Sequence, residues 1–206
     1  MNKTTSGEPK NPRPERRKLS LPLSRETVCS LRAGDQLLLS GQLYTARDAA
    51  HARLIEFDAQ GAELPIKLAG ETIYYTGPCP APPGAVIGSA GPTTSGRMDR
   101  YTPRLLELGL RTMIGKGARD EQVIAAIKRH GAVYLGATGG AGALIAGCIV
   151  KAEIVAFPEL GAEAIRRLTV RDMPVVVLID AEGNDLYQEG RKQFAQPFAQ
   201  TYQAKP

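Results

Sequence analysis

The chain has 206 residues, a formal net charge of +5, no Trp and few other aromatic residues. This length fits one domain, with or without tails, and roughly 70% of the unfolded surface can be buried at this size. No apolar run reaches the roughly 18–20 residues that a membrane-spanning helix needs. The polar, Pro-rich N-terminus also lacks the apolar stretch of a signal peptide. We therefore expect a cytoplasmic protein without a membrane segment.

The excess positive charge lies mainly in residues 1–18. Six Lys or Arg residues and two Glu residues occur there, so this segment carries six minus two, or +4, of the net charge of +5. A short, basic, Pro-rich segment is usually solvated and disordered, and less often a docking arm. The prediction is a disordered basic tail over residues 1–18, a folded domain over residues 19–190 and a polar C-terminal extension over residues 191–206. The tail lacks the interleaved aromatic residues of single-strand binders, so no binding of nucleic acid is expected.

The cysteine and histidine residues indicate no metal site on this chain. Cys29, Cys79 and Cys148 are an odd number, lie far apart and form no C-x-x-C pair, so they favour neither a disulfide framework nor a zinc site. The three thiols could meet around an iron–sulfur cluster, but buried structural thiols are the commoner case. His51 and His130 share no motif. By itself the chain is predicted to bind no metal.

Short apolar runs between turn residues predict strands over residues 36–43, 73–75, 111–114, 132–135, 149–157 and 175–180. Thr45 and Asp48 fit a capping box, in which Thr45 caps a helix that continues to residue 55 and ends before residue 58. Two further helices are predicted, over residues 103–110 and 120–129. The Pro-rich residues 77–84 exclude both a helix and a central strand. The balance of these elements predicts an α+β fold.

Two polar segments contain arginine. Arg47 is predicted near the start of a helix, where a cation is favourable when an anion binds beside it. An ion pair with Asp48 or another nearby carboxylate explains Arg47 equally well. Residues 93–97 contain three consecutive hydroxyls, a glycine and Arg97. They form either an ordinary hydroxyl-capped turn, which is the simpler explanation, or a loop that binds a carboxylate.

Two glycine-rich turns complete the polar set. Lys116 lies between two glycines, but the spacing to the preceding glycine and the missing Ser or Thr exclude a phosphate-binding P-loop. It is either a lysine in solvent or one that reaches a pocket beside the backbone. The glycine run over residues 136–142 departs from the dinucleotide-binding spacing, so close packing or amides around an anion explain it better. Together these groups suit a small dianion, particularly a dicarboxylate, but include no strong electrophile to expel hydroxide.

A series of motifs follows in order over about residues 34–187. They are Ser40 to Arg53, Tyr74 to Pro78, Gly91 to Asp99, Met113 to Gly117, Tyr134 to Gly136, Gly139-Gly140, Phe157 to Gly161 and Asp180 to Asp185. In this order they resemble the carboxy-terminal domain of class I fumarases. The same domain occurs as the β subunit of L-tartrate dehydratase.

The resemblance implies a three-layer β/β/α swivelling domain that docks on a larger α subunit, in a hetero-oligomer of the α2β2 type. That subunit would carry a [4Fe–4S] cluster with three cysteine ligands and one open iron. The resemblance also implies that Arg47, Thr93, Arg97 and Lys116 bind the substrate, and that Thr93 helps to move the proton at C3. His51 is expected to be a structural partner for its helix.

Hydration of fumarate is the preferred function, and three other functions remain open. Hydration of fumarate to (S)-malate is preferred to dehydration of L(+)-tartrate, because residues 74–78 and 96–99 look closer to fumarases. A module that binds a dicarboxylate without catalysis would keep the same residues. Binding of nucleic acid through the basic tail is the third alternative, and it predicts a steep dependence on salt.

Overall fold

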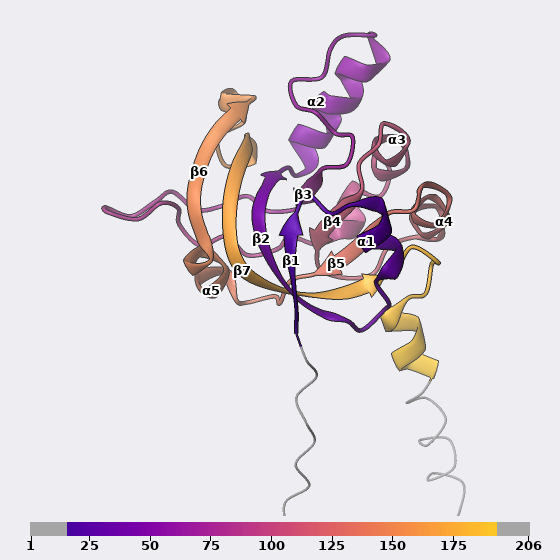
Figure 1. The fold of residues 1–206 in the computed structure, drawn as a ribbon. Helices are drawn as coiled ribbons and strands as arrows, with labels where there is room; N and C mark the ends of the chain where they lie inside the picture. Colours follow the sequence, from indigo (N-terminus) through magenta and orange to yellow (C-terminus); the bar gives the residue numbers. More distant parts are fainter. Residues whose placement is uncertain (1–15, 193–206) are drawn as a thin grey trace, which may run out of the picture.

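Seven strands form one sheet in the computed structural model of the chain, which describes residues 16–192. The strands are β1 (Arg17–Leu21), β2 (Gln36–Thr45), β3 (Thr72–Tyr74), β4 (Thr112–Gly115), β5 (Val133–Gly136), β6 (Ile149–Ala156) and β7 (Ile165–Ile179). They lie in the order β1-β2-β3-β4-β5-β7-β6, and β2 also pairs with β7. This second pairing closes β2, β3, β4, β5 and β7 into a ring, to which β1 and β6 are attached (Figure 1).

The strands β2, β3, β4 and β5 are parallel to one another and in close register. Thr45 pairs with Tyr74, Tyr74 with Ile114, and Ile114 with Leu135. The carboxyl ends of these four strands therefore meet at one edge of the sheet, which is the usual place for a ligand site in parallel sheets. The long strand β7 runs antiparallel to β2, β5 and β6.

The helices and 3-10 turns connect these strands. They are α1 (Arg25–Ser30), α2 (Asp48–Ala59), η1 (Ser95–Met98), α3 (Thr102–Glu107), α4 (Glu121–His130), α5 (Gly142–Gly147) and η2 (Pro158–Glu163). Residues 186–192 are also helical. Helix α4 shows how local sequence sets the bounds: the Asp120 side chain accepts a hydrogen bond from the Val123 amide at 2.8 Å, and Gly131 ends the helix with a φ of 61°. Each helix within residues 16–192 is too short or too polar to span a membrane.

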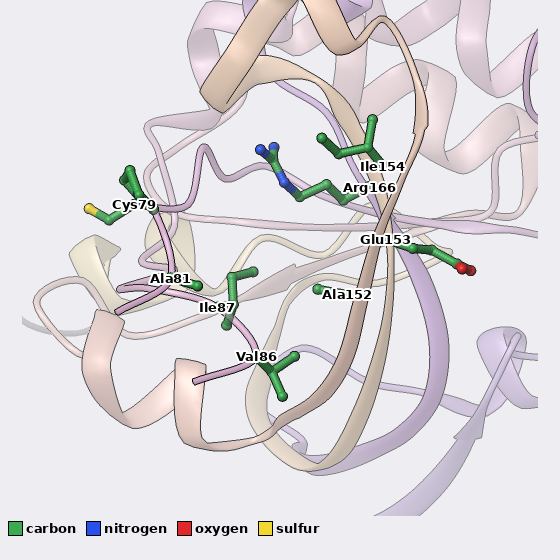
Figure 2. A pocket seen from close by; sticks show the side chains of 9 residues that line it. Cys79, Ala81, Val86, Ile87, Ala152, Glu153, Ile154 and Arg166 are labelled. Atoms are coloured by element: carbon green, nitrogen blue, oxygen red, sulfur yellow. The ribbon is translucent and has the colours of Figure 1, made fainter. Parts of the chain in front are cut away.

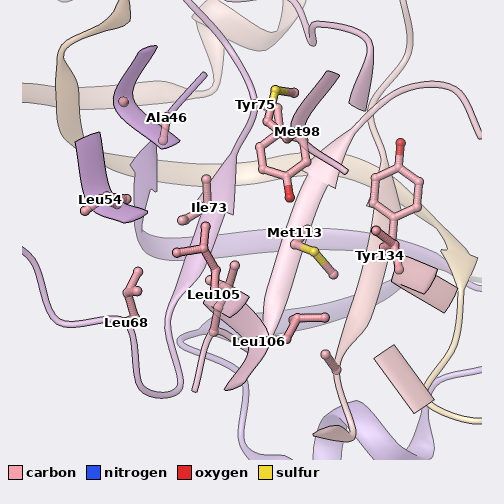
Figure 3. Packing of buried hydrophobic residues seen from close by; sticks show 14 of the residues in the cluster. Ala46, Leu54, Leu68, Ile73, Tyr75, Met98, Leu105, Leu106, Met113 and Tyr134 are labelled. Atoms are coloured by element: carbon pink, nitrogen blue, oxygen red, sulfur yellow. The ribbon is translucent and has the colours of Figure 1, made fainter. Parts of the chain in front are cut away.

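Side chains on β3, β4 and β5 alternate between two hydrophobic clusters. Ile73 and Met113 pack with residues of α2, α3 and α4 (Figure 3). Tyr74 and Ile114 pack with buried residues of β2 and β7, inside the ring. Because both faces of these strands are covered, their sequences are continuous apolar runs. This explains why all three strands were predictable from the sequence.

Most predicted elements are present, but the start of α2 differs. Thr45 does not cap this helix: its hydroxyl accepts a hydrogen bond from the Arg166 amide at 3.0 Å, because β2 extends through Thr45. The helix begins after Arg47, whose backbone is extended and whose side chain makes no capping bond. The capping-box prediction is therefore wrong, and α2 also continues to residue 59, beyond the predicted end.

Two strands also differ from the predictions. Strand β1 was not predicted, and it includes Arg17 and Lys18, the last two residues of the predicted basic tail. Strand β7 begins at Ile165, ten residues before the predicted start at residue 175. The rest of the tail and residues 193–206 lie outside the described residues. The mixture of helices and strands agrees with the predicted α+β domain. The three-layer swivelling arrangement stays a prediction.

Candidate functional site at the carboxyl edge of the parallel strands

The four predicted site residues lie just beyond the carboxyl ends of the parallel strands. Arg47 follows β2 by two residues, and Lys116 directly follows β4. Thr93 is attached to the end of β3, since its amide donates to the Tyr75 carbonyl at 2.8 Å. Arg97 lies in η1, the 3-10 turn that follows Thr93 closely in the chain. The topology thus gathers residues from separate turns at one edge of the sheet.

Arg47 lies in a partly enclosed position, with 22% of its side chain exposed. Its Nη2 is 3.5 Å from Glu163 Oε1, and its Nε is 3.8 Å from Asp48 Oδ2. The second distance is too long for a hydrogen bond, and Nε is buried without a hydrogen-bond partner among the described residues. A Cβ on Gly77 would lie 2.7 Å from Arg47 Nη1, so Gly77 leaves the space that the guanidinium occupies. A buried donor without a hydrogen-bond partner is costly, so this position of the guanidinium is held against an energetic penalty.

Glu163 takes over the capping function that the sequence assigned to Thr45. Its Oε2 accepts a hydrogen bond from the Ala49 amide at 2.8 Å, in the first turn of α2. A carboxylate is favourable at this positively polarised end of a helix. The same carboxylate pairs with Arg47, so η2 fixes both the helix start and the guanidinium.

Arg97 shares a carboxylate with Arg47. Its Nε donates to Asp48 Oδ1 at 2.8 Å, while the other oxygen of Asp48 faces Arg47 at 3.8 Å. Half of the Arg97 side chain is exposed. The bond to Asp48 uses Nε and leaves the two terminal nitrogens for a carboxylate, in the fork geometry that suits guanidinium.

Lys116 is attached to the hydroxyl-rich segment that precedes Arg97. The Lys116 amide donates to Ser95 Oγ at 3.1 Å, and the Ser95 amide donates to the Lys116 carbonyl at 2.9 Å. On its other side the Lys116 chain passes Gly139, where a Cβ would lie 3.5 Å from Lys116 Cδ. That distance is an ordinary contact. The predicted close packing of the glycine run occurs at its two ends, where a Cβ on Gly136 would lie 2.6 Å from Leu178 Cδ1 and a Cβ on Gly142 would lie 2.3 Å from Ser89 Oγ. Whether the three cations contact one anion stays a prediction.

His51 is a structural residue below this edge. It is fully buried, and its Nδ1 lies 2.8 Å from the Arg47 carbonyl oxygen. Burial lowers the pKa of His51 to about 4, and the nearby Arg119 guanidinium acts in the same direction. The neutral imidazole thus holds the backbone at the start of α2, which agrees with the structural role expected for it.

The described residues do not offer a ligand set for a metal or cluster. Within residues 16–192 no group of three His, Cys, Asp or Glu side chains could hold a metal ion. Cys29 and Cys79 are exposed and Cys148 is partly exposed. The expectation of buried structural thiols is therefore wrong for the first two. This donor set does not fit a [4Fe–4S] cluster.

A cavity of about 140 Å³ lies next to this edge, between the Pro-rich loop and β6 (Figure 2). Its lining includes Cys79, Ile87, Ile154 and Arg166. The Arg166 guanidinium donates to the carbonyls of residues 161, 162 and 164, and burial lowers its pKa. These bonds hold the segment that carries Glu163. We therefore assign Arg166 a structural role rather than a place in the predicted substrate site.

Two contributors to the site were not identified from the sequence. Asp48 was noted as part of a capping box and as an ion-pair partner for Arg47, and its stronger bond to Arg97 depends on the fold. Glu163 follows a motif of the resembled family but carries no local signal, because its partners are more than a hundred residues away in the chain. Long-range contacts of this kind need the topology.

The described residues form a mixed α/β domain whose parallel strands end at an edge rich in arginine and lysine. The chain belongs to the family described as the fumarase C-terminus, whose model matches residues 2–190.

Curated relatives agree with this family. The chain is 45% identical over 156 residues to an aerobic class I fumarate hydratase of Salmonella typhimurium, which covers 75% of this chain and 27% of the relative. It has the same identity over 156 residues to the anaerobic class I fumarate hydratase of Escherichia coli, covering 75% of this chain and 28% of the relative. It is 36% identical over 176 residues to a putative L(+)-tartrate dehydratase subunit beta of Methanocaldococcus jannaschii, covering 82% of this chain and 90% of the relative. The chain thus spans little more than a quarter of each of these two fumarate hydratases.

Proposed function

We propose that this chain is the β subunit of an iron–sulfur-dependent hydro-lyase that reversibly hydrates fumarate to (S)-malate. It would act in the cytoplasm, in a hetero-oligomer of the α2β2 type, with the [4Fe–4S] cluster on the α subunit. Similarity to a protein described as a putative L(+)-tartrate dehydratase subunit beta, over 82% of this chain, supports a β-subunit role. The chemistry that is missing from residues 16–192 would then come from the partner.

The observation that carries this proposal is that Asp48 lies between Arg47 and Arg97, at the same edge of the sheet as Lys116. Asp48 and Glu163 balance the two guanidinium charges, so that Lys116 leaves the group with an excess charge of +1. A dicarboxylate brings two negative charges. Arginine binds carboxylates through two parallel hydrogen bonds, and both guanidinium groups keep donors for this purpose. A dicarboxylate therefore suits this group better than a neutral ligand.

In the proposed reaction, Arg47, Arg97 and Lys116 bind and orient the carboxylates of the substrate. When the proton at C3 leaves, negative charge builds up towards the neighbouring carboxylate, and fixed cations stabilise it. Each well-placed ionic contact of this kind supplies roughly 2–4 kcal/mol to a transition state. We assign the Thr93 hydroxyl a role in moving the C3 proton. Because a threonine alone is a poor base, we assign it an acidic partner on the α subunit.

Dehydration of L(+)-tartrate to oxaloacetate is the second candidate reaction. It is supported by the similarity to a putative L(+)-tartrate dehydratase subunit beta, at 36% identity over 176 residues. Like malate, tartrate is a dicarboxylate that loses a hydroxyl group in the reaction. The same cations would therefore bind tartrate.

Anaerobic co-expression with candidate α subunits tests the proposal. We expect the full chain to copurify with an iron–sulfur subunit in a stoichiometric complex that turns over malate faster than tartrate. Faster turnover of tartrate would make the second reaction the correct one. A chain that binds fumarate without a partner, and never forms an active complex, would instead be a non-catalytic binding module.

A further inference from the structure

A buried tyrosine lies directly behind the segment that connects Lys116 with Arg97. The hydroxyl of Tyr134, on β5, is 2.8 Å from Ser95 Oγ and 2.9 Å from the Gly117 carbonyl oxygen. Ser95 Oγ in turn accepts a hydrogen bond from the Lys116 amide. Tyr134 is fully buried, and burial raises its pKa far above the ordinary value, so the hydroxyl keeps its proton.

Only one arrangement of the protons satisfies all three contacts. The Gly117 carbonyl and the Lys116 amide have fixed roles, as acceptor and donor. Tyr134 therefore donates to Gly117 and accepts from the Ser95 hydroxyl, which uses its other lone pairs for the Lys116 amide. The relay holds the backbone on both sides of Lys116.

The packing around Ser95 leaves it little freedom. A Cβ on Gly115 would lie 2.0 Å from Ser95 Oγ, so a glycine is needed there for Ser95 to reach Lys116. The backbone adds a second connection, since the Ser95 amide donates to the Lys116 carbonyl. Ser95 begins η1, which carries Arg97.

The other end of η1 is held by a buried ion pair. Arg119 Nε donates to Asp99 Oδ1 at 2.7 Å, and Arg119 Nη2 donates to Thr102 Oγ1 at 2.7 Å. The Thr102 hydroxyl donates to the carbonyl of Met98, the last residue of η1. Arg97 therefore lies between two fixed points. The Arg119 guanidinium also lies over the rings of both Tyr75 and Tyr134, at 5.4 and 5.0 Å (Figure 3 shows both rings).

We propose that Tyr134 and Ser95 are positioning residues, which fix Lys116 and Arg97 relative to each other so that both cations meet the same dicarboxylate. This inference rests on the proposed function and goes beyond it, because neither residue touches the substrate. Their effect passes through the backbone of residues 93–98 and 115–117.

Two tyrosine-to-phenylalanine variants give a matched test. Tyr134→Phe removes the hydroxyl of the relay. Tyr75→Phe removes a buried hydroxyl that has no hydrogen-bond partner among the described residues. The two rings pack against the same guanidinium and lose the same atom, so the loss of packing is comparable.

The first measurement is steady-state kinetics of the full chain in complex with its iron–sulfur partner. We expect Tyr134→Phe to raise the KM for malate at least fivefold and to lower kcat/KM at least tenfold, with Ser95→Ala acting in the same direction. Tyr75→Phe is expected to stay within twofold of the wild type. A merely structural role would reduce the amount of active enzyme, which lowers the apparent kcat and leaves KM unchanged. A KM within twofold of the wild type for Tyr134→Phe would overturn the inference.

A second measurement does not depend on activity. Hydrogen exchange of the Lys116 amide in the full chain is expected to be at least tenfold faster in Tyr134→Phe than in Tyr75→Phe. If the wild-type complex turned over neither malate nor tartrate, the proposed function would fail, and this exchange would decide the positioning role alone. Equal exchange rates in the two variants would then reject it.

Discussion

Asp48 accepts a hydrogen bond from Arg97 Nε at 2.8 Å and faces Arg47 Nε with its other oxygen at 3.8 Å. One carboxylate thus lies between guanidinium groups from two different elements, the start of α2 and the turn η1. It limits the repulsion between the two cations when no anion is bound.

Arg97→Ala is expected to reduce turnover of the complex by at least two orders of magnitude, because it removes a cation that we propose stabilises charge in the transition state. Assembly with the α subunit should survive. The half-exposed ion pair with Asp48 contributes about 1 kcal/mol or less to folding, and Arg47 remains beside Asp48. Turnover of malate and gel filtration of the complex measure the two effects. Arg100→Ala, an exposed arginine three residues away, is the control. Near-wild-type kinetics in purified Arg97→Ala would refute the role of Arg97.

Gly77→Ala is expected to displace Arg47 without unfolding the domain. The added Cβ would lie 2.7 Å from Nη1 and 3.0 Å from Cδ of Arg47, and a long side chain can move away from it. Since the guanidinium then leaves its position near Asp48 and Glu163, we expect KM for the dicarboxylate to rise about tenfold, by loss of one ionic contact. Gly147→Ala is the matched control, because a Cβ there meets nothing within 4 Å. Equal KM values in the two variants would show that the Arg47 position does not matter.

Thr93→Val is expected to lower kcat about a hundredfold with a smaller change in KM, because it removes a hydroxyl assigned to proton transfer and keeps the shape of the side chain. Thr94→Val is the control: the exposed Thr94 side chain lies next in the chain, and its backbone forms the bridge to Lys116. Pre-steady-state turnover of deuterated malate would separate proton transfer from release of product. Similar kcat values for the two variants would remove Thr93 from the proton-transfer step.

Much of the fold was predictable from the sequence because the pattern is local. The strands β3, β4 and β5 are apolar runs between turns, and α4 has Asp120 and Gly131 at its ends as caps. The start of α2 was not predictable, although Thr45 and Asp48 match a capping box. The tertiary structure offered Thr45 a backbone donor on β7 and gave the helix a distant carboxylate, Glu163. Such long-range partners override a local preference worth only about 1 kcal/mol.

The candidate site was also predictable only where the sequence pattern is local. Arg47, Thr93, Arg97 and Lys116 stood out as polar residues in turns, and the topology places them at one edge of the sheet. The sequence could not show that Asp48 bonds Arg97 rather than Arg47, since that choice depends on how η1 lies against α2. The closed pairing of β2 with β7, which brings η2 to Arg47, also depends on contacts that are distant in the chain.

His51 makes the stability of the domain depend on pH in a defined direction. Burial lowers its pKa to about 4, below the ordinary value of about 6.5 in an unfolded chain. The unfolded chain therefore binds more protons than the folded one at intermediate pH, and stability falls as the pH decreases below about 6.5. Between pH 7 and pH 5 this linkage lowers the free energy of unfolding by about 2 kcal/mol, at about 1.4 kcal/mol per pH unit. His51→Gln should lose this part of the pH dependence, whatever its stability at pH 7.

Urea denaturation of the full chain at pH 7, 6 and 5 measures the slope for each variant. His130→Gln provides the comparison, because it removes the other histidine, which lies at the end of α4 and is not fully buried. The wild type and His130→Gln should show the same loss of stability towards pH 5, and His51→Gln a loss smaller by about 2 kcal/mol. If all three chains lost stability equally, the imidazole would already carry a proton in the folded state near pH 6. His51 would then hold Arg47 as a cation, and its Nε2, which is buried without a partner among the described residues, would need an acceptor.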